Sequence, residues 1–406
     1  MLPSRTHACS KIHLRCRAFV LLVLLLITAL GSPAVQAQAK ASSDFASLST
    51  AASAARDANR LGDAIALYKK ALALRPNWAE GWWSLGTIQY DTNEYPDAAH
   101  SLQKLVALQP KNGMAHAMLG LCQFELGVDD SALRNLEEST ELGITADPEL
   151  RRVLLYHEAV LLQRASKFER SQSLLQQLCL EGTSGAEIED ALGMTLLRMN
   201  ARIPPAAGSP EQKIVTGLGQ AGCLVGQKKY EQAKGILDSL TTEYAQFSNI
   251  HYAAGLLLLD TGDTDSAIKQ FQAEIRNQPG DVLARLKIAA AEYKVNSQAG
   301  ILYAEEAVKI NPQMPLGHYL LGLLLLDAGD YQRAIPELEI ASKAYVNEAK
   351  LYFALGSAYA LAGRKDDAAR ARATFRRLNR EQQEKPKSTG QETLPGPGTT
   401  SGPTSR

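Results

Sequence analysis

The 406-residue sequence predicts an all-α fold, a right-handed solenoid of about ten helix-turn-helix units. The main observation is a period of about 34 residues that prolines mark, since Pro76 and Pro110 are 34 residues apart and Pro279 and Pro312 are 33 apart. Apolar residues within each period have the spacing of two short amphipathic helices and not of strands. One such hairpin cannot bury its own apolar face, so consecutive hairpins are expected to stack into a superhelix with a concave inner surface.

Small residues at fixed places support the hairpin interpretation. The first helix of each unit has glycine or alanine where two helices would touch, at Ala52, Gly86, Gly120, Ala159, Gly193, Ala221, Gly255, Ala289, Gly322 and Gly356. The second helix has its own small residue, at Ala64, Ala98, Ala132, Ser171, Ala233, Ala267, Ala334 and Ala368. The two small sites are twelve residues apart on helices joined by turns such as Leu-Gly-Asp, which predicts tight antiparallel hairpins.

The first 37 residues are expected to be a signal peptide. Basic residues precede a 13-residue apolar run at 18–30, and the small-residue sequence Ala34-Val35-Gln36-Ala37 follows. This order predicts export to the periplasm or cell envelope, with cleavage after Ala37. The run is shorter than the roughly 20 residues of a membrane span. An uncleaved anchor stays an alternative, and contact with a membrane is expected only in that case.

The cysteines favour buried single thiols. After cleavage the chain keeps Cys122, Cys179 and Cys223, an odd number without CxxC spacing. The alternative is a disulfide between two of them in an oxidising compartment.

The fifth unit interrupts the repeat. Its second helix is replaced by Ile203-Pro204-Pro205 and Pro210, which cannot continue a helix. We therefore expect an amino-terminal repeat half at 38–199, an irregular connector at 200–210 and a carboxyl-terminal repeat half at 211–380. The last segment, 381–406, is rich in Pro, Gly, Ser and Thr and is expected to be disordered.

From about residue 44 to residue 379, the units resemble tetratricopeptide repeats, whose pattern is W-x2-L-G-x2-Y, then A-x3-F, then P. The clearest match consists of Trp82, Leu85, Gly86, Ala98, Leu102 and Pro110. Individual copies depart from the pattern: Gln89 takes the tyrosine place in that unit, and His116, His251 and His318 take the tryptophan place in others.

The resemblance implies that positions 2, 5, 9, 12 and 13 of each first helix face a binding groove. The aromatic residues there are Trp83, Tyr90, Phe124, Tyr156, Tyr252, Tyr293, Tyr319 and Phe353, and the acidic ones are Asp91, Glu125, Asp260 and Asp327. Aromatic side chains bury a large area with few rotatable bonds, which suits the binding of an extended peptide. Packing of one repeat on the next is an equally open interpretation of these rings.

The four acids are expected to lie in the last turn of their helices, where each opposes the helix dipole by roughly 0.3–1 kcal/mol. A basic ligand segment would offset them, and the alternative is that they are solvated turn residues. The carboxylate clamp of Lys, Asn and Arg that some members of the family use is absent. Its places hold Glu80, Trp83, Thr87, Met114 and Met118.

The composition argues against other classes of function. Lys+Arg and Asp+Glu both total 43, so no net charge favours nucleic acid as a partner. No catalytic or metal-binding motif is evident, and the repeats leave no stretch for a catalytic domain, so neither enzyme activity nor a cofactor is expected. The prediction is a scaffold that binds a protein or peptide. The alternatives are a glycan-binding module that uses the aromatic row, and an enzyme with an unrecognised site.

Overall fold

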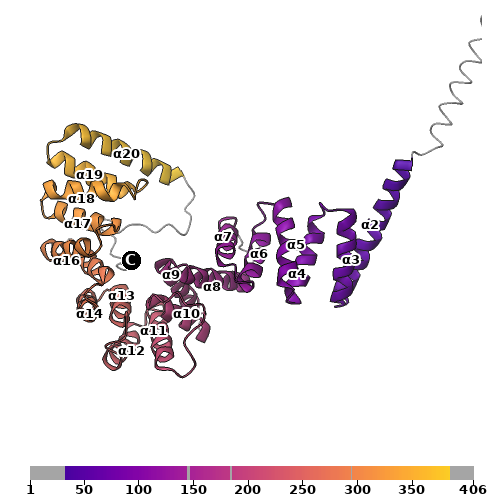
Figure 1. Cartoon of the computed structure of the whole chain (residues 1–406), viewed down its shortest axis with the longest axis horizontal. Coiled ribbons are helices and arrows are strands. Elements are labelled where there is room, and N and C mark those ends of the chain that lie inside the picture. The colour runs from indigo at the N-terminus through magenta and orange to yellow at the C-terminus, as the bar shows by residue number, and fades with distance from the viewer. Residues whose placement is uncertain (1–32, 144–146, 183–184, 294, 385–406) are drawn as a thin grey trace, which may run out of the picture. The chain divides into compact units, whose positions relative to one another are not determined.

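The computed structural model describes residues 33–143, 147–182, 185–293 and 295–384, and every regular element in these ranges is a helix (Figure 1). The helices are α2 (Pro33–Asp57), α3 (Leu61–Leu74), α4 (Ala79–Asp91), α5 (Tyr95–Leu108), α6 (Gly113–Glu125), α7 (Asp129–Glu141), α8 (Pro148–Arg164), α9 (Phe168–Leu180), α10 (Ala186–Leu196), α11 (Pro210–Gly226), α12 (Tyr230–Glu243), α13 (Ile250–Thr261), α14 (Thr264–Asn277), α15 (Val282–Glu292), α16 (Ser297–Ile310), α17 (Pro315–Asp327), α18 (Tyr331–Ser342), α19 (Ala349–Leu361) and α20 (Lys365–Glu384). The predicted all-α fold of stacked helical hairpins is confirmed.

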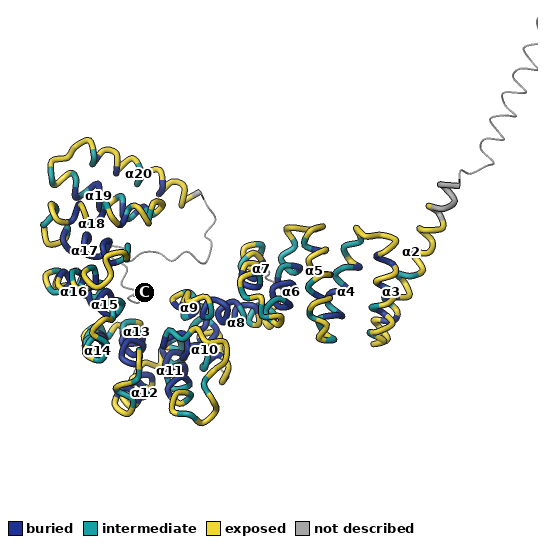
Figure 2. Tube along the Cα trace, viewed as in Figure 1, coloured by how far each residue is buried: buried dark blue, intermediate teal, exposed yellow. Residues whose placement is uncertain are grey.

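The small residues lie where the helices touch. All ten small sites of the first helices are buried, as are those of the second helices. Figure 2 shows that buried stretches recur from helix to helix along the chain. A methyl group added at Gly86 would lie 2.7 Å from the side chain of Leu102, and one added at Gly255 would lie 2.6 Å from Phe271. Each of these large residues stands sixteen positions later, on the second helix of the same hairpin. A large side chain of the second helix therefore occupies the space that the glycine leaves.

The histidines at the tryptophan place have a structural explanation. Trp82 donates its Nε1–H to the carbonyl of Pro76, six residues earlier, at 2.7 Å. Nε2 of each histidine lies at the same kind of carbonyl, that of Pro110 for His116 (3.0 Å), Ala245 for His251 (3.0 Å) and Pro312 for His318 (2.9 Å). Because a carbonyl oxygen only accepts, Nε2 carries the proton in each case. Histidine thus replaces tryptophan as the donor that fixes the chain before the first helix.

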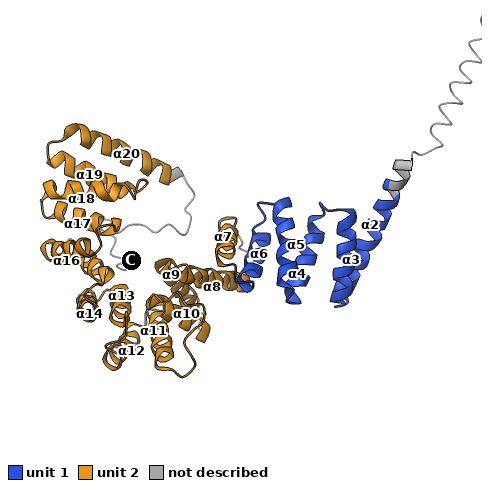
Figure 3. Cartoon of the chain, viewed as in Figure 1, with its two compact units in different colours: residues 1–128 blue, residues 129–406 orange. Residues whose placement is uncertain are grey.

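The chain divides into two compact units, unit 1 at Met1–Val128 and unit 2 at Asp129–Arg406 (Figure 3). We expected the division at 200–210. That segment instead lies within unit 2, because the helices on its two sides pack directly on each other.

Glycines explain this direct packing of α10 on α11. A methyl group at Gly193 would lie 1.8 Å from the carbonyl oxygen of Val215, and one at Gly219 would lie 1.8 Å from that of Glu189. No side chain other than hydrogen fits where two backbones are this close. Helix α11 therefore packs against α10 where the missing second helix of the fifth unit would otherwise lie.

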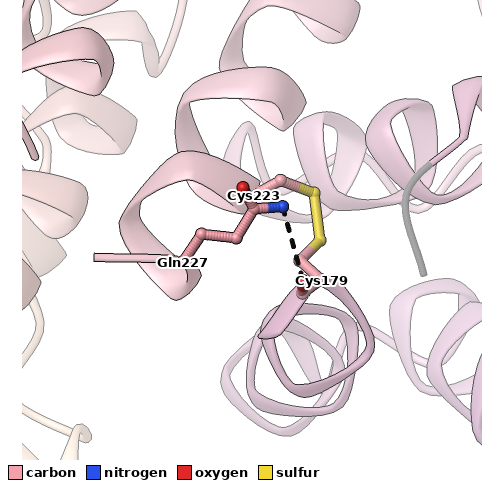
Figure 4. The surroundings of a disulfide bond; sticks show 3 residues. All are labelled: Cys179, Cys223 and Gln227. Carbon is pink, nitrogen blue, oxygen red and sulfur yellow. Dashed lines mark hydrogen bonds between the residues drawn. A yellow bond between two sulfur atoms is a disulfide. The ribbon is translucent and has the colours of Figure 1, made fainter. Parts of the chain in front are cut away.

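A disulfide joins the same region (Figure 4). Cys179 of α9 and Cys223 of α11 are bonded, with their Cα atoms 5.1 Å apart. Gln227 donates its side-chain amide to the carbonyl of Cys179 at 3.4 Å. Cys122 is a buried free thiol. The expectation of single thiols is thus wrong for Cys179 and Cys223, and the disulfide alternative describes them.

The irregular connector is anchored to α8 and to the start of α7. Gln163 donates its side-chain amide to the carbonyls of Met199 and Ala201, the second at 3.3 Å. Asp129 forms ion pairs with Arg202 at 2.8 Å and with Arg164 at 3.3 Å. These contacts hold the amino-terminal end of the irregular sequence, 199–202, against α7 and α8.

The two terminal predictions extend beyond the described residues. Residues 1–32 of the predicted signal peptide lie outside them, and 33–37 begin α2. Helix α20 continues to Glu384, so the first four residues of the expected tail are helical, and 385–406 lie outside the described part. Among the helices within residues 33–384, none has the length and apolar character of a membrane span.

Candidate functional site

Two of the predicted groove residues belong to the core of unit 2. Tyr252 is 1% exposed and contacts Phe271, with ring centroids 5.8 Å apart, and Tyr319 is fully buried near Tyr345. Neither hydroxyl has a hydrogen-bond partner among the described residues, and burial raises the pKa of both phenols well above the ordinary value. The expectation that these two rings face a partner is therefore wrong, and packing is their role.

Two of the predicted acids accept hydrogen bonds from side chains of neighbouring helices. Asp260 accepts hydrogen bonds from the amides of Gln172 at 3.1 Å and Gln176 at 3.2 Å, both on α9. Reduced solvation raises the pKa of Asp260 above its usual range. Asp327 accepts a hydrogen bond from the hydroxyl of Ser297. Internal donors thus take the place of the basic ligand that these acids suggested.

The remaining predicted residues of unit 2 do not form a continuous exposed row, because the buried rings of Tyr252 and Tyr319 interrupt it. Tyr156 is half-buried on α8 beside His157, with ring centroids 5.4 Å apart. Tyr293 is partly buried against the core of the last repeats. Phe353 on α19 is 53% exposed and is the one predicted aromatic residue that reaches solvent freely among the described residues.

The other five predicted residues lie in unit 1, at the carboxyl-terminal ends of α4 and α6 and near the start of α4. We call this set the α4–α6 face, and it consists of Trp83, Tyr90, Asp91, Phe124 and Glu125. All three rings are half-buried. Trp83 and Tyr90 pack on the buried cluster that contains Leu102 and Leu119. The core therefore holds these two rings in place while part of each stays exposed.

The acids of the α4–α6 face are unpaired. Asp91 and Glu125 are exposed, and neither forms a hydrogen bond or ion pair within the described part of the chain. Burial raises the pKa of Tyr90 to about 12, and the charge of Glu125 adds to this shift. The phenol is therefore neutral at physiological pH, and the negative charge of the face comes from the two carboxylates.

One further residue of this face was not in the predicted set. Met118 on α6 is partly buried in the same cluster as Trp83 and Tyr90. From the sequence, Met118 was expected only to replace one residue of the carboxylate clamp. Its residue type could have indicated a binding role, since methionine is flexible and polarizable and adapts to irregular apolar partners.

Family models decide the family of the chain. A model described as tetratricopeptide repeat matches residues 84–141, 220–282, 252–315 and 319–378, more than half of the chain, and one described as TPR repeat matches 52–92. The chain belongs to the tetratricopeptide repeat family. The matched ranges stop at Glu141 and resume at Gln220, on either side of the interval where the tetratricopeptide pattern lacks a second helix.

Individual relatives of this tetratricopeptide protein are distant. A peroxisomal targeting signal receptor of Saccharomyces cerevisiae is 21% identical over 276 residues, which are 68% of this chain and 36% of the receptor. A crystal structure of MamA has 17% identity and a TM-score of 0.38, and the overlap covers 41% of this chain and 97% of that one. The APC/C hetero-tetramer Cut9–Hcn1 has 16% identity and a TM-score of 0.34, with 83% and 87% covered. This chain thus spans about a third of the receptor's length.

Proposed function

We propose that this tetratricopeptide-repeat protein is a non-enzymatic scaffold that binds a partner protein through a segment with basic and apolar side chains, on the α4–α6 face. The family supports the general statement, a scaffold for protein–protein interaction. The observation that supports the particular site is the pair of unpaired carboxylates, Asp91 and Glu125, beside the half-exposed rings of unit 1.

The energetics favour a basic segment. Asp91 and Glu125 are the last residues of α4 and α6, where a negative charge opposes the helix dipole by roughly 0.3–1 kcal/mol. A lysine or arginine of a partner would remove this unfavourable term. Its aliphatic stem would cover the ring of Trp83 or Tyr90, and a cation over such a ring adds about 0.5–1 kcal/mol at an exposed site. Rings that are already held by the core lose little entropy on binding.

We further propose that the scaffold acts in an exported compartment. The predicted signal peptide at 1–37 supports this, and so does the disulfide between Cys179 and Cys223, because disulfides persist in oxidising compartments and are rare in the cytosol. Cell fractionation followed by amino-terminal sequencing tests it, and the expected mature start is Gln38. A protein that is recovered from the cytosol with its first 37 residues would contradict export.

The binding proposal is tested with a labelled peptide that alternates lysine and phenylalanine and with the 38–406 chain. Fluorescence anisotropy is expected to show binding that Trp83→Ala with Tyr90→Ala weakens at least about tenfold, as for central aromatic contacts. Asp91→Lys with Glu125→Lys should weaken it similarly. The matched control is Glu138→Lys with Glu141→Lys, which reverses two exposed acids in the last turn of α7 that have no ion-pair partner among the described residues. Equal losses in the control and in the site variant would refute the site.

The glycan-binding alternative loses its structural basis. It required a row of exposed rings for stacking on sugar faces, with Tyr252 and Tyr319 as members. Both are buried.

A further inference from the structure

Helix α20, the last helix that the structure describes, has a row of arginines without a pairing partner among the described residues. Five arginines and no acidic residue lie between Ala368 and Arg380 in α20. Arg370 pairs with Asp367, and Arg377 pairs with Glu381 at 2.8 Å. The other three are Arg372, Arg376 and Arg380. They are exposed and form no hydrogen bond or ion pair with any described residue.

The spacing of these three residues makes them a continuous surface. Positions four apart in an α-helix lie on nearly the same side, about 6 Å apart along the axis. We call Arg372, Arg376 and Arg380 the arginine row. A different side of α20 is fixed to the protein, because Ala371 and Leu378 are buried.

An exposed aromatic ring adjoins the arginine row. Phe375 of α20 contacts Phe353 of α19, with ring centroids 5.5 Å apart, and Phe353 is 53% exposed. The stem of Arg372 packs over Gly356 of α19, since a methyl group added there would lie 3.1 Å from its Cγ. One turn of α19 therefore presents Phe353 and supports the first arginine of the row.

We propose that the arginine row and Phe353 bind an acidic segment of a partner protein that also has apolar side chains. Guanidinium groups bind carboxylates through two parallel hydrogen bonds. Carboxylates four residues apart on a partner helix would repeat at the same distance of about 6 Å. An apolar side chain beside them would cover Phe353, a contact that a purely polar polyanion does not provide.

The same observations disfavour a lipid surface as the ligand. A helix that lies on a membrane inserts its apolar face, and the apolar face of α20 is already buried against the protein. Attraction to anionic headgroups would then depend on three arginines and one ring alone. This surface belongs to unit 2 and binds an acidic ligand, whereas the α4–α6 face binds a basic one. Each of the two proposals can therefore fail without the other.

The test uses the 38–406 chain and a labelled, amino- and carboxyl-blocked peptide of glutamate and leucine. Fluorescence anisotropy should show saturable binding that weakens with added salt. Arg372→Glu with Arg376→Glu and Arg380→Glu should reduce the affinity at least about tenfold, the sum expected for three exposed ion pairs. Phe353→Ala should reduce it about threefold or more, which distinguishes the combined surface from a purely ionic one.

A matched control reverses three exposed lysines of unit 1 that pair with no residue in the described part of the chain, as Lys70→Glu, Lys104→Glu and Lys111→Glu. It is expected to leave the affinity within about twofold. Circular dichroism should show that the variants keep the helical content of the original chain. The proposal is overturned if the peptide does not bind, or if the arginine variant binds it as well as the original chain does. It is also overturned if phosphatidylglycerol vesicles bind to the arginine row and the peptide does not.

Discussion

Removal of the disulfide between Cys179 and Cys223 is expected to destabilise the centre of unit 2. The two cysteines are 44 residues apart in sequence, and the loop that they close contains α10 and the connector. In the chain-entropy treatment, a loop of this length restricts the unfolded chain by about 4 kcal/mol at 25 °C. We therefore expect most of that free energy to be lost on reduction.

The measurement is urea denaturation of the 38–406 chain with and without a reductant, compared with Cys179→Ala/Cys223→Ala. Both side chains are buried, so the double variant also loses a small apolar contribution. Reductant should lower the stability of the original chain and leave that of the variant unchanged. Because a repeat array need not unfold in one step, native-state hydrogen exchange of α9 to α11 locates the effect. Equal exchange of these helices in the oxidised and reduced chains would refute the argument.

Counting the thiols gives an independent result. Burial raises the pKa of the Cys122 thiol to about 12, so it is expected to be unreactive in the folded protein. A thiol reagent should therefore modify none of the cysteines of the folded 38–406 chain, one after unfolding without reductant, and three after unfolding with it. Three reactive thiols in the unreduced, unfolded chain would show that the disulfide is not formed.

The packing of the helices gives three further predictions, each measured by chemical denaturation. Gly193→Ala should lower the free energy of unfolding by more than about 3 kcal/mol, because its methyl group meets the backbone of α11. Gly235→Ala, at an open position in α12, should raise it by about 0.5–1 kcal/mol. The reverse order would contradict the close approach of α10 and α11. Tyr319→Phe removes a buried hydroxyl that has no partner among the described residues, so stability should be unchanged or about 1 kcal/mol higher, and a loss would show that the hydroxyl is bonded. Trp82→Phe loses the bond to the preceding turn and should cost about 1–2 kcal/mol, and Trp82→His should restore part of it; equal stabilities of these two variants would contradict a role for the donor.

The sequence predicted the fold well because the determining contacts are local. A small residue and the large residue that covers it, such as Gly86 and Leu102, stand sixteen positions apart in one hairpin, so their relation repeats visibly along the chain. The missing second helix of the fifth unit was also evident from its prolines. What could not be predicted was how the helices on the two sides of this gap are arranged. Whether α10 and α11 separate or pack depends on Gly193 meeting α11 and Gly219 meeting α10, a match that no period reveals.

The candidate site was only partly predictable for a similar reason. Trp83, Tyr252 and Tyr319 occupy the same position of their first helices, yet Trp83 is half-buried and both tyrosines are buried. Position in the repeat determines the direction of a side chain, whereas its exposure depends on what the next repeat places over it. For Tyr319 that includes Tyr345, which is outside the regular helices. The prediction of binding residues from position alone therefore holds best where neighbouring repeats leave the surface open, as on α4 and α6.

The missing helix also explains why neither proposed binding surface lies in the middle of unit 2. Without it, α9 faces α13, and the amides of Gln172 and Gln176 reach Asp260 across more than eighty residues of sequence. At the start of α9, Glu169 pairs with Arg198 at 2.9 Å, and loss of solvation near this pair lowers the pKa of Lys287 despite the attraction of Glu169. Acids and bases of this region thus compensate one another within the protein. A partner would have to displace these internal contacts there. By contrast, the two acids of the α4–α6 face and the arginine row form no hydrogen bond or ion pair with the described residues.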